Sequence, residues 1–233
     1  MMNLLQGWRG PLSGLASVAC VTTVAALPAV AGGASVAHAA AGLTRAAAAC
    51  PGAETPIGST TLAASRAALS CLIGAVRAER GLGPVRADDR LAAAARSHAA
   101  DMVRRGYFAH RSPDGSKVGD RLAHAGWTPS RGSWWAGEIL VAGSGAAGTP
   151  RRLVAAWLMS PHHRSVLLSA RPNAIGLGAV RNTPDREHAN TGITVDAVFA
   201  RHCAGGPGAT GTDPLSGYRT RSHQDREPDL CAA

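Results

Sequence analysis

The chain has 233 residues, a length that fits one ordinary domain of roughly 100 to 150 residues with additional terminal segments. It carries 24 Lys and Arg against 15 Asp and Glu, which gives a formal charge of +9. All of these basic residues except Lys117 are Arg, they are scattered along the chain, and aromatic residues make up only 4% of it. Because nucleic-acid binding needs clustered bases with stacking aromatics, this pattern argues against a nucleic-acid partner.

Residues 1–39 have the composition of a secretory signal peptide. They contain no acid and one base, Arg9, followed by a small, apolar run over Leu12–Val30 and by Ala37-His38-Ala39, the small-x-small spacing of a signal peptidase site. We therefore expect a cleaved signal and a secreted, extracellular protein. The alternative is an uncleaved membrane anchor, because the apolar run of 19 residues approaches the roughly 20 that span a bilayer.

Removal of the signal leaves four cysteines: Cys50, Cys71, Cys203 and Cys231. An even number in an exported chain predicts disulfides, and four cysteines allow three pairings. We expect the two local pairs, Cys50–Cys71 and Cys203–Cys231, each of which would clip a terminal segment to the domain. A zinc site made by all four cysteines is disfavoured because no C-x-x-C spacing occurs.

Helices are predicted in the first half of the mature chain. Thr61–Arg80 carries one apolar stripe, and Asp88–Arg105 begins with two acids and carries a stripe that includes His98; a glycine follows each of these helices. A shorter helix over Val118–Ala125 is expected after the turn sequence Ser112-Pro113-Asp114-Gly115.

The second half mixes strands with helices. A strand is predicted over Trp134–Val141, two helices separated by a kink over Leu153–Met159 and His162–Leu168, and a hairpin of strands over Ala174–Val180 and Asn190–Ala200. Helices followed by antiparallel strands indicate an α+β fold. We expect the domain over residues 61–203, an N-terminal disulfide-clipped segment over 40–60 and a flexible, Gly- and Pro-rich tail over 204–233.

Three side chains have the chemistry of a functional site. His110 follows an aromatic pair just after the second helix, where packed rings would hold it against a groove. His163 lies in the first turn of a helix opened by Ser160-Pro161, where the helix dipole favours the neutral imidazole that ligates metals or accepts protons. Glu138 lies within an apolar strand, so we expect a partly buried carboxylate with a His or Arg partner, and Gly137 beside it is expected to allow a close backbone approach.

Five segments between Leu72 and about His202 follow one another in a specific order and spacing: Val76–Pro84, Leu91–Met102, Gly106–Gly115, Gly137–Ile139 and Trp157–Arg164. Together they resemble the bacterial CAP superfamily of cysteine-rich secretory proteins, antigen 5 and pathogenesis-related 1 proteins, whose domain is also called the SCP domain. The resemblance implies a three-layer α-β-α sandwich with a small antiparallel sheet and a central cavity lined by two His and two Glu.

By motif, the two histidines of that cavity fall on His110 and His163, and one glutamate falls on Glu138. Ser160 stands where eukaryotic members have the second glutamate, as is usual for bacterial members. Some members hold a divalent metal such as zinc, so the resemblance makes His110, Glu138 and His163 candidate ligands. His162 replaces the usual glycine and either adds a ligand or faces solvent.

A hydrogen-bond network without metal would satisfy the same buried carboxylate equally well. His98, on the apolar stripe of its helix, is expected to be a hydrogen-bonded core residue, because buried polar groups normally find partners.

The first functional hypothesis is a secreted, monomeric, non-catalytic module that binds an extracellular ligand in this cavity: a lipid or sterol, a cell-wall fragment or a protein. It depends on the lack of a placed nucleophile, since the mature chain contains neither a G-x-S-x-G motif nor a cysteine outside the expected disulfides. The second hypothesis is a metal-dependent hydrolase that uses His110, Glu138 and His163. The third is a structural surface protein with a vestigial cavity.

Overall fold

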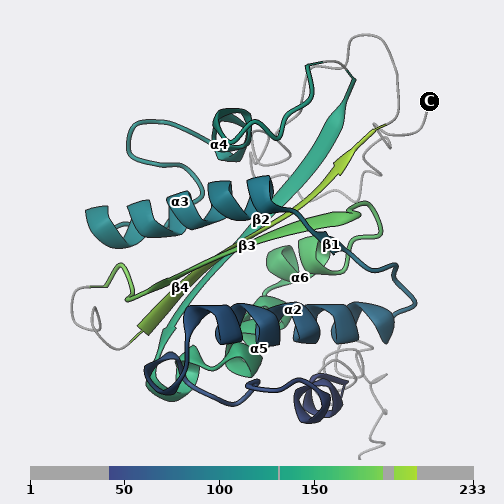
Figure 1. Ribbon diagram of the computed structural model, residues 1–233, viewed down its shortest axis with the longest axis vertical. Helices are drawn as coiled ribbons and strands as arrows, with labels where there is room; N and C mark the ends of the chain where they lie inside the picture. Colours follow the sequence, from purple (N-terminus) through teal and green to yellow (C-terminus); the bar gives the residue numbers. More distant parts are fainter. Residues whose placement is uncertain (1–41, 131, 186–191, 204–233) are drawn as a thin grey trace, which may run out of the picture. The chain divides into compact units, whose positions relative to one another are not determined.

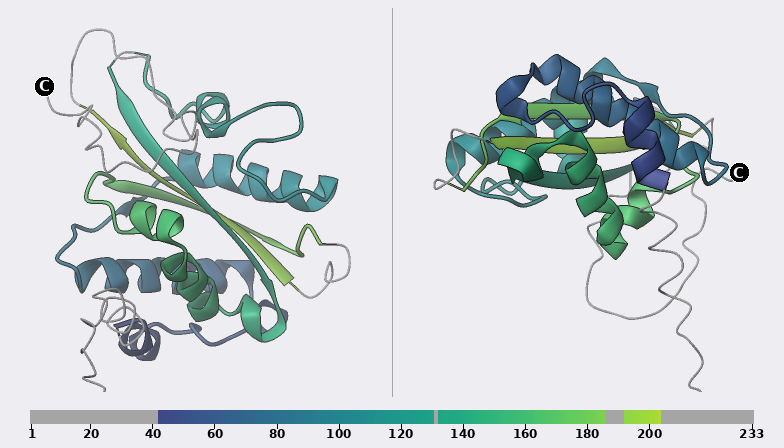
Figure 2. Two further views of the ribbon diagram at one scale, coloured as in Figure 1. Left: turned by 180° about the vertical axis from the view of Figure 1, so that it is seen from behind. Right: turned by 90° about the horizontal axis from the view of Figure 1, so that it is seen from below.

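The computed structural model describes residues 42–130, 132–185 and 192–203. A four-stranded sheet separates two layers of helices, with α3 and α4 on one face and α2, α5 and α6 on the other (Figure 1). Two further views show the same arrangement from behind and from below (Figure 2). The expected α+β fold with a three-layer α-β-α sandwich is confirmed.

The sheet has the strand order β1-β3-β4-β2, where β1 is Arg86–Ala87, β3 is Ala174–Arg181, β4 is Gly192–His202 and β2 is Trp134–Ser144. The pairs β3·β4 and β4·β2 are antiparallel, as expected. The two-residue strand β1 was not predicted, and it pairs with β3 in parallel, so the sheet is mixed. A strand this short carries no periodic pattern, and only its partner defines it.

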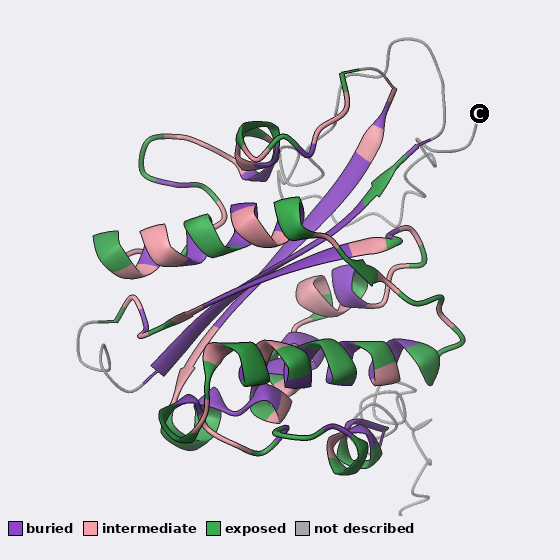
Figure 3. Cartoon of the chain, in the orientation of Figure 1, coloured by how far each residue is buried: buried purple, intermediate pink, exposed green. Residues whose placement is uncertain are grey.

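Figure 3 shows the central strands buried along most of their length, and alternate residues of these strands face two separate cores. On β4, Val195, Ala197 and Phe199 face α2, α5 and α6, whereas Val198 and Ala200 face α3 and α4. Residues of β2 divide in the same way, so that position 138 lies on the face covered by α3. The strand β2 extends three residues beyond the predicted end because it pairs with β4 as far as Ser144.

Two glycines of β3 let α3 approach the sheet closely. An added Cβ at Gly176 would lie 2.2 Å from the carbonyl carbon of Leu91, and one at Gly178 would lie 2.1 Å from the backbone nitrogen of Arg96. Gly137 behaves differently from the expectation: its close neighbours are the side chains of Val166 and Trp135, at 2.8 and 2.9 Å from an added Cβ, and not another backbone.

The predicted helices are present with small shifts of their ends: α2 is Leu62–Ala78, α3 is Asp89–Arg105, α4 is Val118–His124, α5 is Pro150–Met159 and α6 is Pro161–Leu167. Side chains cap most of them. Thr61 accepts from the backbone of Ala64, and one oxygen of Asp88 accepts two backbone N–H groups of α3. Gly106 ends α3 in the left-handed region with φ of 68°.

The segment before α2 belongs to the core beneath it. Residues 42–49 are helical, η1 is Ile57–Ser59, and the side chains of Leu43, Ala46 and Ile57 are buried. The predicted disulfide Cys50–Cys71 is confirmed and joins this segment to α2. Cys203 is also disulfide-bonded, but Cys231, its expected partner, lies outside the described residues, so that pairing stays a prediction.

The expected signal peptide over 1–39 and the tail over 204–233 also lie outside the described residues. Within the described ranges, no helix has the length and apolar character needed to cross a membrane.

Candidate functional site

The site is built around Glu138, in the middle of β2. Its side chain is fully buried beneath α3, between the inward-facing Ala136 and Leu140. Moving an ionised carboxylate out of water is costly unless the charge is paired, so this residue requires charged or hydrogen-bonding partners.

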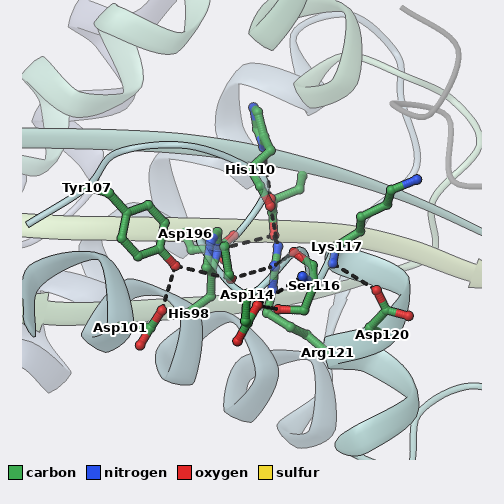
Figure 4. A network of polar contacts seen from close by, with 12 residues as sticks. His98, Asp101, Tyr107, His110, Asp114, Ser116, Lys117, Asp120, Arg121 and Asp196 are labelled. Carbon is green, nitrogen blue, oxygen red and sulfur yellow. Dashed lines mark hydrogen bonds and ion pairs between the residues drawn. The ribbon is translucent and has the colours of Figure 1, made fainter. Parts of the chain in front are cut away.

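Three side chains converge on the Glu138 carboxylate, and Figure 4 shows them with their neighbours. Oε2 lies 2.8 Å from Nδ1 of His110, whereas Oε1 accepts a hydrogen bond of 2.7 Å from the Arg121 guanidinium. Oε1 also lies 3.5 Å from Nδ1 of His98. The expectation that a His or an Arg partners Glu138 is confirmed, and both types do so.

These partners determine the ionisation of the site. Burial alone would raise the pKa of Glu138, but the hydrogen bonds from His110 and His98 and the charge of Arg121 together hold that pKa well below its usual range. Glu138 is therefore an anion at neutral pH and a weak base.

His98 is the hydrogen-bonded core histidine that the sequence predicts. It is buried, and its Nδ1 lies 2.9 Å from Oδ2 of Asp196, a residue of β4. Asp196 was missed in the sequence, although one signal was available: it is the only acid in Gly192–His202, and it has the same parity as the inward-facing Val198 and Ala200.

The His98–Asp196 pair retains a proton. Burial lowers the pKa of His98, but hydrogen bonds with Asp196 and Glu138 outweigh this effect and raise it to about 9. Burial and the charge of Glu138 raise the pKa of Asp196 to about 8. At neutral pH the pair therefore holds at least one proton.

Arg121 also fixes the loop that carries His110. One terminal nitrogen of its guanidinium donates to the backbone carbonyl of His110 at 3.0 Å, and the other to that of Ser116 at 3.3 Å. The Arg121 side chain is only 11% exposed, whereas that of His110 is 34% exposed. One arginine thus positions both the loop and the carboxylate, and His110 is the member of the network that reaches the surface.

Residues near His110 in the loop after α3 line two hollows, although His110 itself lines neither. One, of about 470 Å³, is lined by residues of α3 and α4 that include Arg121, together with Asp114 and Ser116 of the loop. The other, of about 270 Å³, is lined by Phe108, the end of β2 and residues 183–185. The first hollow reaches the network through Arg121, whereas the second contains none of its members.

The remaining predicted residues lie at the start of α6. The ring of His162 lies 6.5 Å from that of His110 and 5.9 Å from that of His163, measured between centroids. Burial, then the neighbouring histidines, lower the pKa of both His162 and His163, which favours neutral rings. The hydroxyl of Ser160 caps α6 by accepting from the backbone of His163 at 3.4 Å.

The structure therefore brings His110 onto Glu138 and gathers His162 and His163 near His110. In the described part of the chain, His163 makes no hydrogen bond or ion pair with Glu138. The expected ligand set of His110, Glu138 and His163 stays a prediction.

A different group of side chains is close enough to hold a metal ion. Ligand atoms of His98, Glu138 and Asp196 all lie within 4.8 Å of one another, and all three residues are buried. The charges of this group balance without a metal, because Arg121 offsets Glu138 and the proton held by the His98–Asp196 pair offsets the second acid. These residues thus fit a buried ionic network.

Comparisons with known proteins agree with this architecture. Residues 72–196 match the model of the CAP family, described as the cysteine-rich secretory protein family. The uncharacterized protein YkwD of Bacillus subtilis (strain 168) is 32% identical over 111 residues, which cover 48% of this chain and 40% of YkwD. The chain thus spans less than half the length of this curated relative.

Two solved structures are also similar to this chain. An extracellular protein containing an SCP domain from Bacillus anthracis str. Ames is 23% identical with a TM-score of 0.48, over 61% of this chain and 44% of that one. An outer surface protein from Borrelia burgdorferi is 25% identical with a TM-score of 0.47, over 57% of this chain and 90% of that one. Because the family match covers more than half of the sequence, the chain belongs to the CAP family of cysteine-rich secretory proteins.

Proposed function

We propose that this protein is a secreted, non-catalytic binding module that takes an extracellular ligand at His110. One observation carries the proposal: a partly exposed imidazole is fixed at Nδ1 by a fully buried, ionised Glu138. A surface ring with a fixed tautomer and orientation is preorganised for recognition, because less conformational freedom is lost when the ligand binds.

The chemistry of the network favours binding over acid–base catalysis. Both oxygens of Glu138 already have hydrogen-bonding partners, and its lowered pKa makes it a poor general base. The three described cysteines are in disulfides, and the hydroxyl of Ser160 caps a helix. No described residue therefore combines the nucleophile and adjacent base that covalent catalysis needs.

The proposed ligands are a lipid or sterol, a cell-wall fragment or a protein, bound by a monomer without nucleic acid. The hollows lined by other residues of the His110 loop support a ligand larger than a single ion. Export of this chain through residues 1–39 is part of the proposal.

The binding hypothesis is tested with the mature chain, residues 40–233, against purified cell-wall sacculi and against phosphatidylglycerol vesicles with and without sterol. His110→Ala should weaken binding by about tenfold or more, which corresponds to ~1.4 kcal/mol. Arg80→Ala, at an exposed position just after α2 that lines neither hollow, is the control and should bind as the wild type does. Binding that is independent of His110, or a hydrolytic rate that requires it, would contradict the proposal.

A metal-dependent hydrolase is the second candidate, favoured by the contact between Glu138 and Nδ1 of His110. A metal-ligating histidine usually donates its other ring N–H to a carboxylate, so His110 fits a zinc or other divalent ion on its Nε2 side. His110 and His163 would then hold the metal, with Glu138 orienting His110. Such an ion would supply Lewis acidity and an activated water.

Elemental analysis of the purified mature protein near neutral pH tests this second candidate. Stoichiometric zinc that disappears in both His110→Ala and His163→Ala would support a metal centre. Protein that stays metal-free after zinc is added would contradict it and leave the binding hypothesis in place.

A further inference from the structure

On the side away from His110, the Glu138 carboxylate contacts residues that lie below the surface. Its Oε1 accepts from Arg121 and faces Nδ1 of His98, which in turn lies 2.9 Å from Oδ2 of Asp196. The side chains of His98, Glu138 and Asp196 are all 0% exposed. A ligand at His110 would therefore reach none of these three, and their effect on it must pass through Glu138.

The sheet register explains why this arrangement is needed. Glu138 of β2 pairs with Val198 of β4, and Asp196 pairs with Leu140, so the two carboxylates are diagonal neighbours on one face. Two buried carboxylates repel each other strongly at low dielectric. Without a cation between them, Glu138 would turn away from Asp196 or take up a proton, and either change would alter its contact with His110.

His98 separates the two carboxylates. The groups that face it are Asp196 from β4, Glu138 from β2 and, at 6.2 Å between ring centroids, Tyr107 from the loop after α3. Arg121 of α4 donates to the same oxygen of Glu138 that faces His98. The two histidine contacts are unequal, since Nδ1 of His98 lies 2.9 Å from Asp196 but 3.5 Å from Glu138. Asp196 thus anchors the His98 ring beside Glu138.

We propose that His98 and Asp196 are positioning residues for the His110 site. Asp196 fixes the imidazole of His98, and His98 together with Arg121 holds Oε1 of Glu138, so that Oε2 faces Nδ1 of His110. As a result His110 keeps its proton on Nδ1 and presents Nε2 to the ligand. The inference rests on the proposed function only in assigning the ligand to His110; the positioning itself is a property of the free protein.

Nitrogen NMR of the histidine rings tests the inference on the mature chain labelled with ¹⁵N-histidine. At a pH above the ordinary titration range of histidine, ring nitrogen shifts distinguish the two tautomers, and His110→Ala assigns the His110 signals. We expect the Nδ1–H form of His110 to predominate in the wild type. His98→Leu removes the donor, and Asp196→Asn removes the anchoring charge, so both should lose this predominance.

Two further variants separate positioning from general structural support. His98→Asn restores an N–H donor close to the position of Nδ1 and should recover the Nδ1–H form of His110. Asp89→Asn removes an exposed carboxylate from α3, the helix that carries His98, and should leave the His110 ring nitrogen shifts unchanged. Backbone amide spectra report whether each variant is folded. If His98→Leu does not fold, the near-isosteric Asp196→Asn variant provides the test.

The inference would be overturned if the His110 tautomer were unchanged in the folded Asp196→Asn variant. It would also be overturned if the His110 tautomer were the same in His98→Asn as in a folded His98→Leu variant. These results are independent of ligand binding. If the tautomer responds as expected while sacculi and vesicles bind without regard to His110, the proposed function fails and the positioning role stands.

Discussion

At the scale of the residue, Arg77 shows how hydrogen bonds compensate a buried charge for its lost hydration. Arg77 of α2 is 1% exposed and has carbonyl partners instead of an acid: one terminal nitrogen donates to Leu167 and Ser169 at 2.9 and 2.8 Å, and the other donates to Gly83 at 3.0 Å. The planar guanidinium reaches all three carbonyls at once, and a lysine ammonium on its single flexible stem does not match this fork.

Arg77→Lys should therefore lower the free energy of unfolding by about 2 kcal/mol, because it leaves buried carbonyls without a donor. Urea denaturation measures the change. Arg80→Lys, at an exposed position one turn away, is the matched control and should be nearly neutral. Equal effects of the two substitutions would contradict the role assigned to the Arg77 carbonyl contacts.

The buried pair His98 and Asp196 predicts how stability depends on pH. The pKa of His98 is raised to about 9 from about 6.5 in unfolded chains, so its contribution is fully present below pH 6.5 and is lost as pH rises through 9. The pKa of Asp196 is raised to about 8, so its burial also costs stability as pH rises toward that value. Both effects have the same sign.

We therefore expect the free energy of unfolding to fall between neutral pH and about pH 9, with a slope of about 1.4 kcal/mol per pH unit for each proton involved. Asp196→Asn cannot ionise and should flatten this slope, whereas Asp89→Asn should leave it unchanged. Urea unfolding at a series of pH values provides the measurement. A wild-type slope that persists in Asp196→Asn would show that the pair does not hold the proton.

At the scale of the element, the depth of α3 on the sheet determines where His98 lies. Gly178 permits this close packing, since an added Cβ would meet the backbone of Arg96 at 2.1 Å. A helix backbone cannot rotate out of the way as a side chain can. Any side chain at Gly178 must therefore lift α3 and with it the ring of His98.

Gly178→Ala should destabilise the protein by about 3 kcal/mol, the upper part of the range for an overpacked core. Gly74→Ala is the control, because Gly74 lies in α2 with no atom within 4 Å of an added Cβ. The control should gain up to about 1 kcal/mol from helix propensity. Thermal or urea unfolding compares the two, and a tolerated Gly178→Ala would mean that α3 can shift without loss.

At the scale of the whole molecule, the disulfide and the Glu138 network lie on opposite faces of the sheet. The disulfide Cys50–Cys71 and the buried Leu43, Ala46 and Ile57 stabilise the face covered by α2 and α5. The network around Glu138 lies on the opposite face, beneath α3. Loss of the disulfide is therefore expected to change stability without changing the site geometry.

The double variant Cys50→Ala, Cys71→Ala should lower the free energy of unfolding by about 3 kcal/mol, from the loss of a crosslink that spans 21 residues. The His110 ring signals should stay as in the wild type, since the sheet separates the two regions. Chemical denaturation gives the first quantity and NMR the second. A shifted His110 spectrum in the folded variant would show that the two faces are coupled.

The sequence by itself determined the local structure and part of the site. Caps, stripes and terminal glycines predicted α2 and α3 because their hydrogen bonds close within four residues, and an acid inside the apolar β2 predicted a buried Glu138 with a cationic partner. Only the tertiary structure decided the pairing of β1, the choice of Arg121 and the role of Asp196. His98 and Asp196 are 98 residues apart, and they meet because the β2·β4 register and the close approach of α3 bring them together. Such contacts depend on the relative placement of several elements, and no local pattern records that placement.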